Sequence, residues 1–140
     1  MDALYLLFDL LKLVVSLPNR RTPLAKVIRA AKRKQQVLLV TAPNSQNAPF
    51  QAQKELLGAA SKQLREHNVL VLHALHTELS HGEKSYLDQY YDLLIKRFEV
   101  VLIDKDGNVK RRSYHPLTPT ALLTSIDQMP MCQQEMRRKR

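Results

Sequence analysis

The stretch TAPNSQNAPF, from Thr41 to Phe50, follows an apolar run and precedes a helical pattern, so we expect it to form a turn between a strand and a helix. Such turns are where α/β proteins seat nucleophiles, because a helix N-terminus favours a thiolate. Peroxide-reducing enzymes place this cysteine three residues after a threonine, and here the same spacing reaches Asn44. An amide does not attack peroxide. We therefore interpret Asn44 as a degenerate redox-loop position, with Asn44 and Asn47 acting as turn and helix-capping residues.

The single cysteine, Cys132, follows Pro130 in a basic tail and excludes an intrachain disulfide. Its cationic neighbours favour a thiolate, but no second cysteine or histidine lies near it in the sequence. Redox enzymes with such a turn also carry a cis-proline before a later strand, and the segment Ile95–Phe98 contains no proline. We therefore predict no catalytic residue. A divergent thiol oxidoreductase, in which Cys132 works with an intermolecular partner, is the enzymatic alternative.

Histidines and aspartates raise the question of a metal site. Three-residue spacing along a strand sends His73 and His76 to opposite faces, so they would share an ion only if the strand ended between them. Asp104 and Asp106 resemble the start of a calcium loop, but Gly107 comes too early and no glutamate stands at the bidentate position. We predict a hairpin turn there, and we expect neither a metal nor a cofactor.

The chemistry that remains is positive charge. The chain has 22 Lys and Arg against 13 Asp and Glu, a net charge of +9, which favours binding to polyanions. The candidate polyanion-binding residues are Arg20, Arg21, Lys26, Arg29, Arg33, Lys110, Arg111, Arg112, Arg137, Arg138, Lys139 and Arg140. Solubility and protection of a sheet edge are the competing explanations for these clusters. Nucleic acid is disfavoured as a partner because no aromatic residues are interleaved with the clusters for base stacking.

The apolar periodicity predicts the elements that must position these residues. The expected strands are 37–40, 69–75, 99–103 and 109–113, and the expected helices run over 50–67, 85–98 and from 118 to a stop at 130. This βαβαββα order predicts an α/β, thioredoxin-like fold with a four-stranded mixed sheet flanked by helices. A flavodoxin-like sheet is excluded, because Lys105–Asn108 leave no room for a helix between the last two strands.

Two further helices are expected before the sheet. Residues 1–17 form an apolar helix interrupted by Asp9 and Lys12, which is too short to span a bilayer and has no standard signal-peptide cleavage site. We interpret it as a docked helix, with a membrane-surface or export segment as the alternative. Thr22 and Pro23 should begin the second helix. The predicted organisation is N-terminal helices at 1–34, a thioredoxin-like domain at 35–130 and a basic tail at 131–140.

Three motifs carry a family resemblance: VLLVTAPN in the first strand, VVLIDKDGNVKRRS around the hairpin, and HPLTPTALLTSIDQMP followed by CQQEMRRKR. Over about residues 36–138, the chain resembles the peroxiredoxin-like domain shared by sushi-repeat-containing proteins and multi-copy vertebrate matrix proteins, which also occurs alone in exported bacterial proteins. The His-rich segment 73–83 and the N-terminus depart from that pattern.

The resemblance implies a non-catalytic interaction module in the extracellular matrix or in cell adhesion, extracellular or exported, which binds a matrix glycoprotein or a sulfated glycosaminoglycan. The alternatives to this function are the divergent oxidoreductase described above and an intracellular basic protein that associates with nucleic acid.

Overall fold

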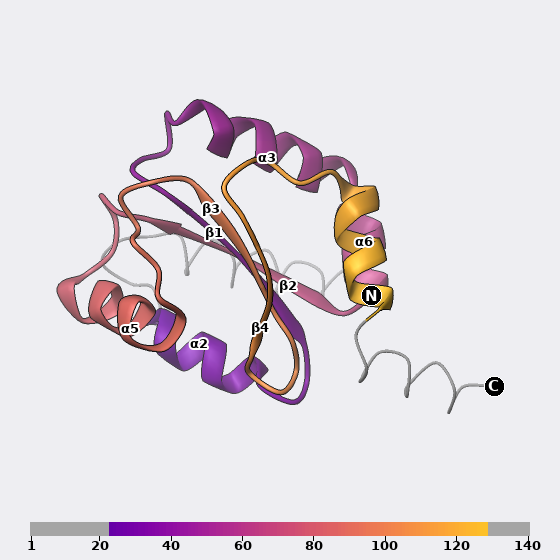
Figure 1. Cartoon of the computed structure of the whole chain (residues 1–140), viewed down its shortest axis with the longest axis horizontal. Helices are drawn as coiled ribbons and strands as arrows, with labels where there is room; N and C mark the ends of the chain where they lie inside the picture. The colour runs from indigo at the N-terminus through magenta and orange to yellow at the C-terminus, as the bar shows by residue number, and fades with distance from the viewer. Residues whose placement is uncertain (1–22, 129–140) are drawn as a thin grey trace, which may run out of the picture.

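The computed structural model describes residues 23–128, which form a four-stranded mixed sheet with helices on both faces (Figure 1). The strands are β1 (Gln36–Ala42), β2 (Val69–Leu75), β3 (Glu99–Ile103) and β4 (Val109–Ser113). They lie in the order β2-β1-β3-β4, with β1 and β2 parallel and the other two pairs antiparallel. The central strands β1 and β3 are buried along their whole length, because both of their faces are covered.

Alternation along β1 divides the core into two layers. Leu38 and Val40 pack on what we call the α3 face, which is covered by α3 (Ala48–Ala59), α4 (Ser61–Glu66) and α6 (Pro119–Asp127). Val37 and Leu39 pack on the opposite face, the α2 face, which is covered by α2 (Leu24–Ala31) and α5 (His81–Tyr91). Figure 1 shows α3 and α6 above the sheet and α2 and α5 below it. The predicted thioredoxin-like fold class is therefore confirmed.

The hairpin and the last helix also form as predicted. Gly107 has a φ of 87° between β3 and β4, and the Asn108 N–H donates to the Asp106 carboxylate at 2.8 Å. The predicted hairpin turn is confirmed. The Thr118 hydroxyl accepts from the Ala121 N–H at 3.2 Å and caps α6. The helix ends at Asp127, before the expected stop at residue 130.

The helix predicted at 85–98 is wrong at both ends. It begins four residues earlier, at His81, because Ser80 and Glu83 form a capping box. It ends after Tyr91, where Asp92 adopts a left-handed φ of 53°. Leu94 and Phe98 suggested the longer helix, but both lie in the following loop, where Leu94 is exposed and Phe98 is buried together with Leu93 and Ile95. The apolar spacing thus continues past the end of the helix, because the loop also buries apolar side chains.

Three other boundaries differ from the prediction. The helix expected at 50–67 is divided at Ala60 into α3 and α4. Pro23 is the N-cap of α2 and not its first residue, and β1 is longer than expected by one residue at its start and two at its end. Thr22 and the expected helix at 1–17 lie outside the described residues. Among residues 23–128, no helix has the length and apolar character needed to cross a bilayer.

The predicted division of the chain at residues 34 and 130 stays a prediction. Within the described residues, Leu24, Ile28 and Ala31 of α2 belong to the same core cluster as Val37 and Ile103 of the sheet.

Candidate functional site

The turn between β1 and α3 is held by its two asparagines. The Asn44 side-chain oxygen accepts from the Gln46 N–H at 2.9 Å, which forms a tight local turn. The Asn47 side-chain oxygen accepts from the Phe50 N–H at 3.1 Å and caps α3. The predicted turn and capping roles are confirmed. The Asn44 side chain is therefore engaged with the backbone of its own turn, and its assignment as a degenerate redox-loop position stays a prediction.

The side chain of the threonine before this turn also hydrogen-bonds to the backbone. Thr41 is fully buried, and its hydroxyl lies 3.2 Å from the Arg97 carbonyl oxygen and 3.3 Å from that of Glu99. One hydroxyl proton is thereby shared between two acceptors at the start of β3. No peptide bond among residues 23–128 is cis. Cys132 lies outside the described residues.

A buried carboxylate lies beside the turn, and sequence analysis missed it. Glu99 is paired with Thr41 in the sheet and has no exposed surface. Its Oε2 lies 2.7 Å from Nη1 of Arg112, while its Oε1 accepts no hydrogen bond and lies 3.9 Å from Nε of Arg97. Arg112 also donates to the carbonyl oxygen of Tyr91, at the end of α5. This network joins β3, β4 and α5, and it has a structural role.

The histidines lie at the end of β2. β2 ends at Leu75, so the strand does end between His73 and His76. No cluster of three or more His, Cys, Asp or Glu side chains suited to a metal occurs in the described part of the chain. His73 meets the ring of Phe50 edge-on at 5.1 Å. Desolvation and the nearby charge of Lys54 lower the pKa of His73 from 6.5 to about 4, although part of its surface stays exposed.

Acidification is expected to destabilise the fold through His73. Because its pKa is lower in the folded state than in the unfolded state, its stabilising effect is complete above pH 6.5 and is lost as the pH falls towards about 4. The His73→Phe variant should lose less stability than the wild type between pH 7 and pH 5 in urea unfolding. His115→Phe changes an exposed histidine and is the control. Equal pH dependence of all three proteins would contradict this expectation.

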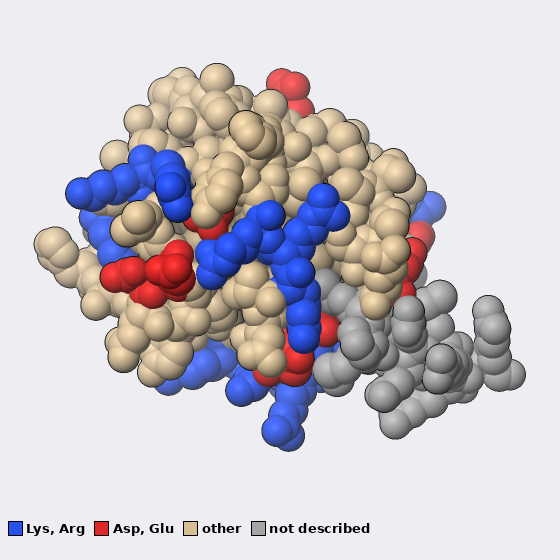
Figure 2. All heavy atoms as spheres, viewed as in Figure 1, with Lys and Arg blue, Asp and Glu red and all other residues tan. Residues whose placement is uncertain are grey.

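The cations of β4 are partnered within the fold. Lys110 lies 3.1 Å from the Asp106 carboxylate, and Arg112 holds Glu99. The guanidinium of Arg111 donates to the hydroxyl of Ser125 in α6. Figure 2 shows positive side chains gathered over β4 in the middle of the view, with acidic side chains close beside them. The cations of the predicted cluster at residues 110–112 therefore interact mainly with other residues of the same fold.

The cations of α2 and of the turn that follows it are different. Lys26, Arg29 and Arg33 are exposed, and within residues 23–128 none of them lies in ion-pair distance of a carboxylate. The C-terminal end of α2 meets the hairpin, where the Arg33 N–H donates to the Lys105 carbonyl at 2.8 Å. The other predicted basic residues, at 20–21 and 137–140, lie outside the described residues. Of the predicted clusters within the described residues, α2 and the turn after it thus present the positive charge that is available to a ligand.

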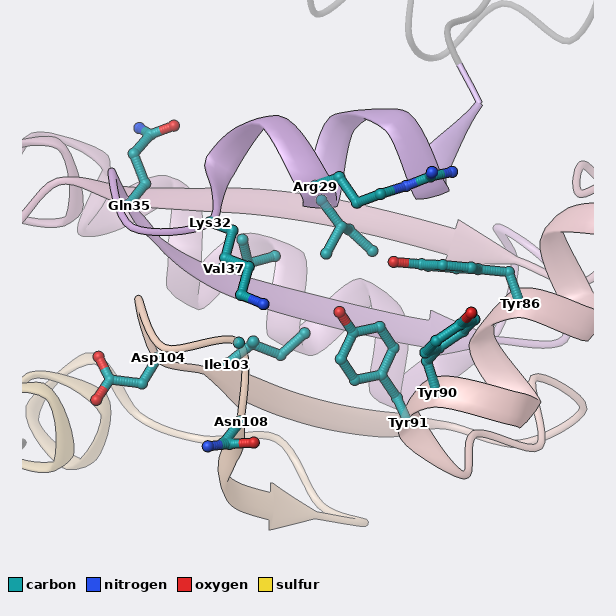
Figure 3. Close-up of a pocket in the computed structure, with 12 residues that line it drawn as sticks. Arg29, Lys32, Gln35, Val37, Tyr86, Tyr90, Tyr91, Ile103, Asp104 and Asn108 are labelled. Atoms are coloured by element: carbon teal, nitrogen blue, oxygen red, sulfur yellow. The ribbon is translucent and has the colours of Figure 1, made fainter.

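A pocket of about 490 Å³ opens beside this charge, between α2, α5 and the β3–β4 hairpin (Figure 3). Tyr86, Tyr90 and Tyr91 line it, with ring centroids of Tyr86 and Tyr90 4.7 Å apart. Burial and a hydrogen bond with Tyr86 raise the pKa of Tyr91. Sequence analysis interpreted this stretch only as an amphipathic helix. The spacing of Tyr86 and Tyr90, four residues apart on one helix face, was the available signal.

The chain is similar in sequence to curated proteins and in fold to a solved structure. The sushi repeat-containing protein SRPX2 of Rattus norvegicus is 29% identical over 117 residues, and that of Homo sapiens is 27% identical over 118 residues. Each match covers 76% of this chain and 25% of the relative, so the chain spans about a quarter of the length of the curated relatives it matches. A reduced 2-Cys peroxiredoxin of Plasmodium vivax has a TM-score of 0.60 at 19% identity, covering 76% of this chain and 71% of that chain.

These similarities confirm the expected peroxiredoxin-like domain, and the likeness to the peroxiredoxin concerns the fold alone. A family model described as "Domain of unknown function (DUF4174)" matches residues 27–135, so the match begins inside α2. Because that model covers most of the chain, the protein belongs to the DUF4174 family.

Proposed function

We propose that this chain is a non-catalytic interaction module that binds a sulfated glycosaminoglycan in the extracellular matrix. The observation that carries the proposal is the set of exposed cations on α2 and the turn after it, which have no carboxylate partner within residues 23–128. Unpaired cations are available to the sulfate and carboxylate groups of such a polymer. The similarity to sushi repeat-containing proteins supports a role in the matrix.

The absence of catalysis in this proposal rests on the β1–α3 turn. Asn44 stands where peroxide-reducing enzymes place a cysteine, and its side chain is engaged with the Gln46 N–H. The Thr41 hydroxyl before it is engaged with two carbonyl groups. We therefore expect the wild type and the Cys132→Ser variant to consume peroxide at the same background rate. A rate that falls with Cys132→Ser would favour the oxidoreductase alternative.

Affinity for heparin tests the binding surface. The variant Lys26→Gln/Arg33→Asn removes one cation of α2 and one of the turn after it, and asparagine suits the left-handed φ of 69° at Arg33. Since each exposed ion pair contributes about 0.2–1 kcal/mol, we expect this variant to bind heparin about threefold to tenfold more weakly. The measurement is surface plasmon resonance at two salt concentrations, because screening should weaken the interaction.

The matched control is Lys54→Gln/Lys62→Gln. These exposed lysines lie on α3 and α4, on the other side of the sheet, and their loss changes the net charge by the same amount. We expect the control to lose little affinity. Equal losses in the two variants would mean that net charge alone attracts heparin, and would overturn the proposal of a binding surface on α2.

A further inference from the structure

The pocket between α2, α5 and the hairpin lies beside the charged surface and is a candidate ligand site. Its volume of about 490 Å³ lies within the range of about 300–1,000 Å³ that is typical of small-ligand sites. Three segments that are distant in sequence form it, with Arg29 from α2 and Lys32 from its C-cap, Tyr86 and Tyr90 from α5, and Asn108 from the hairpin. Figure 3 shows these side chains converging from the three elements.

The charge of this pocket is positive. Arg29 in the last turn of α2 and Lys32 at its C-cap are both exposed, and neither has an ion-pair partner among the described residues. Asp104 belongs to the pocket lining, but its carboxylate points away from the tyrosines (Figure 3). That carboxylate accepts from the Lys105 N–H at 2.8 Å and from the Gln36 amide at 3.4 Å. The side chains that face the pocket therefore favour an anionic ligand.

The tyrosine side chains that line the pocket indicate a second property of the ligand, a group that can stack on an aromatic ring. Tyr90 lines the pocket and is 64% exposed, so its ring is accessible to a ligand. Tyr86 packs against it at a tilt of 39° and holds the guanidinium of Arg29 at 5.9 Å from its own ring centroid. A ring face carries partial negative charge and attracts the polarised C–H groups on one face of a sugar ring. The tyrosine hydroxyl groups can also hydrogen-bond to sugar hydroxyl groups.

The hairpin closes the pocket at Gly107. Its φ of 87° disfavours any side chain, and a Cβ at this position would lie 3.1 Å from Cε of Lys32. The missing side chain lets Lys32 cross the hairpin and place its amine at the pocket. The sequence of the turn therefore positions one of the two cations.

We propose that this pocket binds one anionic sugar unit of the polysaccharide, with the sugar ring on Tyr90 and Tyr86 and its sulfate or carboxylate group between Arg29 and Lys32. This inference rests on the proposed function and deepens it, because it places recognition of a single unit at a defined site.

The test uses Tyr90→Ala, which leaves the charge of the protein unchanged. The probe is a fully sulfated heparin disaccharide, titrated into the full chain and followed by NMR of the tyrosine rings. Stacking and ordering of the sugar ring are lost in the variant, so we expect binding about tenfold weaker than in the wild type. Tyr114→Ala is the matched control, since Tyr114 is 51% exposed and lies against Arg97, outside the pocket lining. We expect it to bind as the wild type does.

The possible outcomes separate the two proposals. If the Tyr90→Ala and Tyr114→Ala variants bind the disaccharide equally, the pocket inference is overturned, while polymeric heparin binding that depends on Lys26 and Arg33 would still support the proposed function. If polymeric heparin shows no such dependence but the disaccharide binds the wild type and not Tyr90→Ala, the pocket stands and the polymer proposal fails. Tighter binding of a mononucleotide than of the disaccharide at this site would also overturn the inference.

Discussion

Replacing Arg112 with leucine is expected to lower the free energy of unfolding by about 3 kcal/mol, because it leaves a buried carboxylate without its partner. Glu99 is fully buried, and its only hydrogen bond from a guanidinium within the described residues is the 2.7 Å contact with Arg112. The substitution also removes the hydrogen bond to the Tyr91 carbonyl. We take the lower end of the range for buried pairs, since the Arg112 side chain is 31% exposed and water can reach the site. Urea unfolding at pH 7 measures the change.

Two variants show whether the effect belongs to this pair. The double variant Glu99→Leu/Arg112→Leu removes both charges and should recover most of the loss, to within about 1 kcal/mol of the wild type. Lys110→Leu, on the same strand, breaks only an exposed pair with Asp106 and should cost less than about 0.5 kcal/mol. A double variant that is less stable than Arg112→Leu alone would contradict the assignment of Glu99 as the destabilised group.

Replacing Gln53 with alanine is expected to lower the free energy of unfolding by about 3 kcal/mol, because two backbone groups lose the side chain to which they are hydrogen-bonded. Gln53 is fully buried in α3, and its amide donates to the Leu117 carbonyl at 2.9 Å while its oxygen accepts from the Leu117 N–H at 2.7 Å. Both Leu117 groups would lose their partner in a place that water does not reach. The loss should appear as a lower midpoint in urea unfolding with an unchanged slope.

Further variants separate the effect of the shape of the Gln53 side chain on stability from the effect of its hydrogen bonds. Gln53→Met keeps the volume but serves neither Leu117 group, so we expect it to lose almost as much stability as Gln53→Ala. Gln63→Ala changes an exposed glutamine of α4 and should cost less than about 0.5 kcal/mol. If Gln53→Met restored full stability, packing and not hydrogen bonding would explain the role of Gln53.

The order of elements could be predicted because its signals are local. Buried strands appear as short apolar runs, the sequence Asp106-Gly107-Asn108 specifies a tight hairpin, and Thr118 with Pro119 marks a helix start. Helix ends were less predictable, since the loop after Tyr91 buries apolar side chains at intervals that resemble those of a helix. The turn roles of Asn44 and Asn47 were predictable for the same reason that the hairpin was, because each acts on backbone groups two or three residues away.

The candidate site was less visible in the sequence because long-range pairs define it. Nothing in the run from Lys110 to Arg112 shows that Arg112 would be held by Glu99 or that Arg111 would reach α6. The pocket needs α2, α5 and the hairpin to converge, and these segments lie far apart in the chain. Charge could be counted from sequence, but which cations remain available for a ligand depends on the fold.

The two sides of helix α2 differ in burial and in charge. Its apolar residues Leu24, Ile28 and Ala31 seal the sheet, while Lys26 and Arg29 face outward. On the proposed function, substitutions on the outward side change ligand binding and leave the core contacts of the helix in place, whereas loss of the helix removes both.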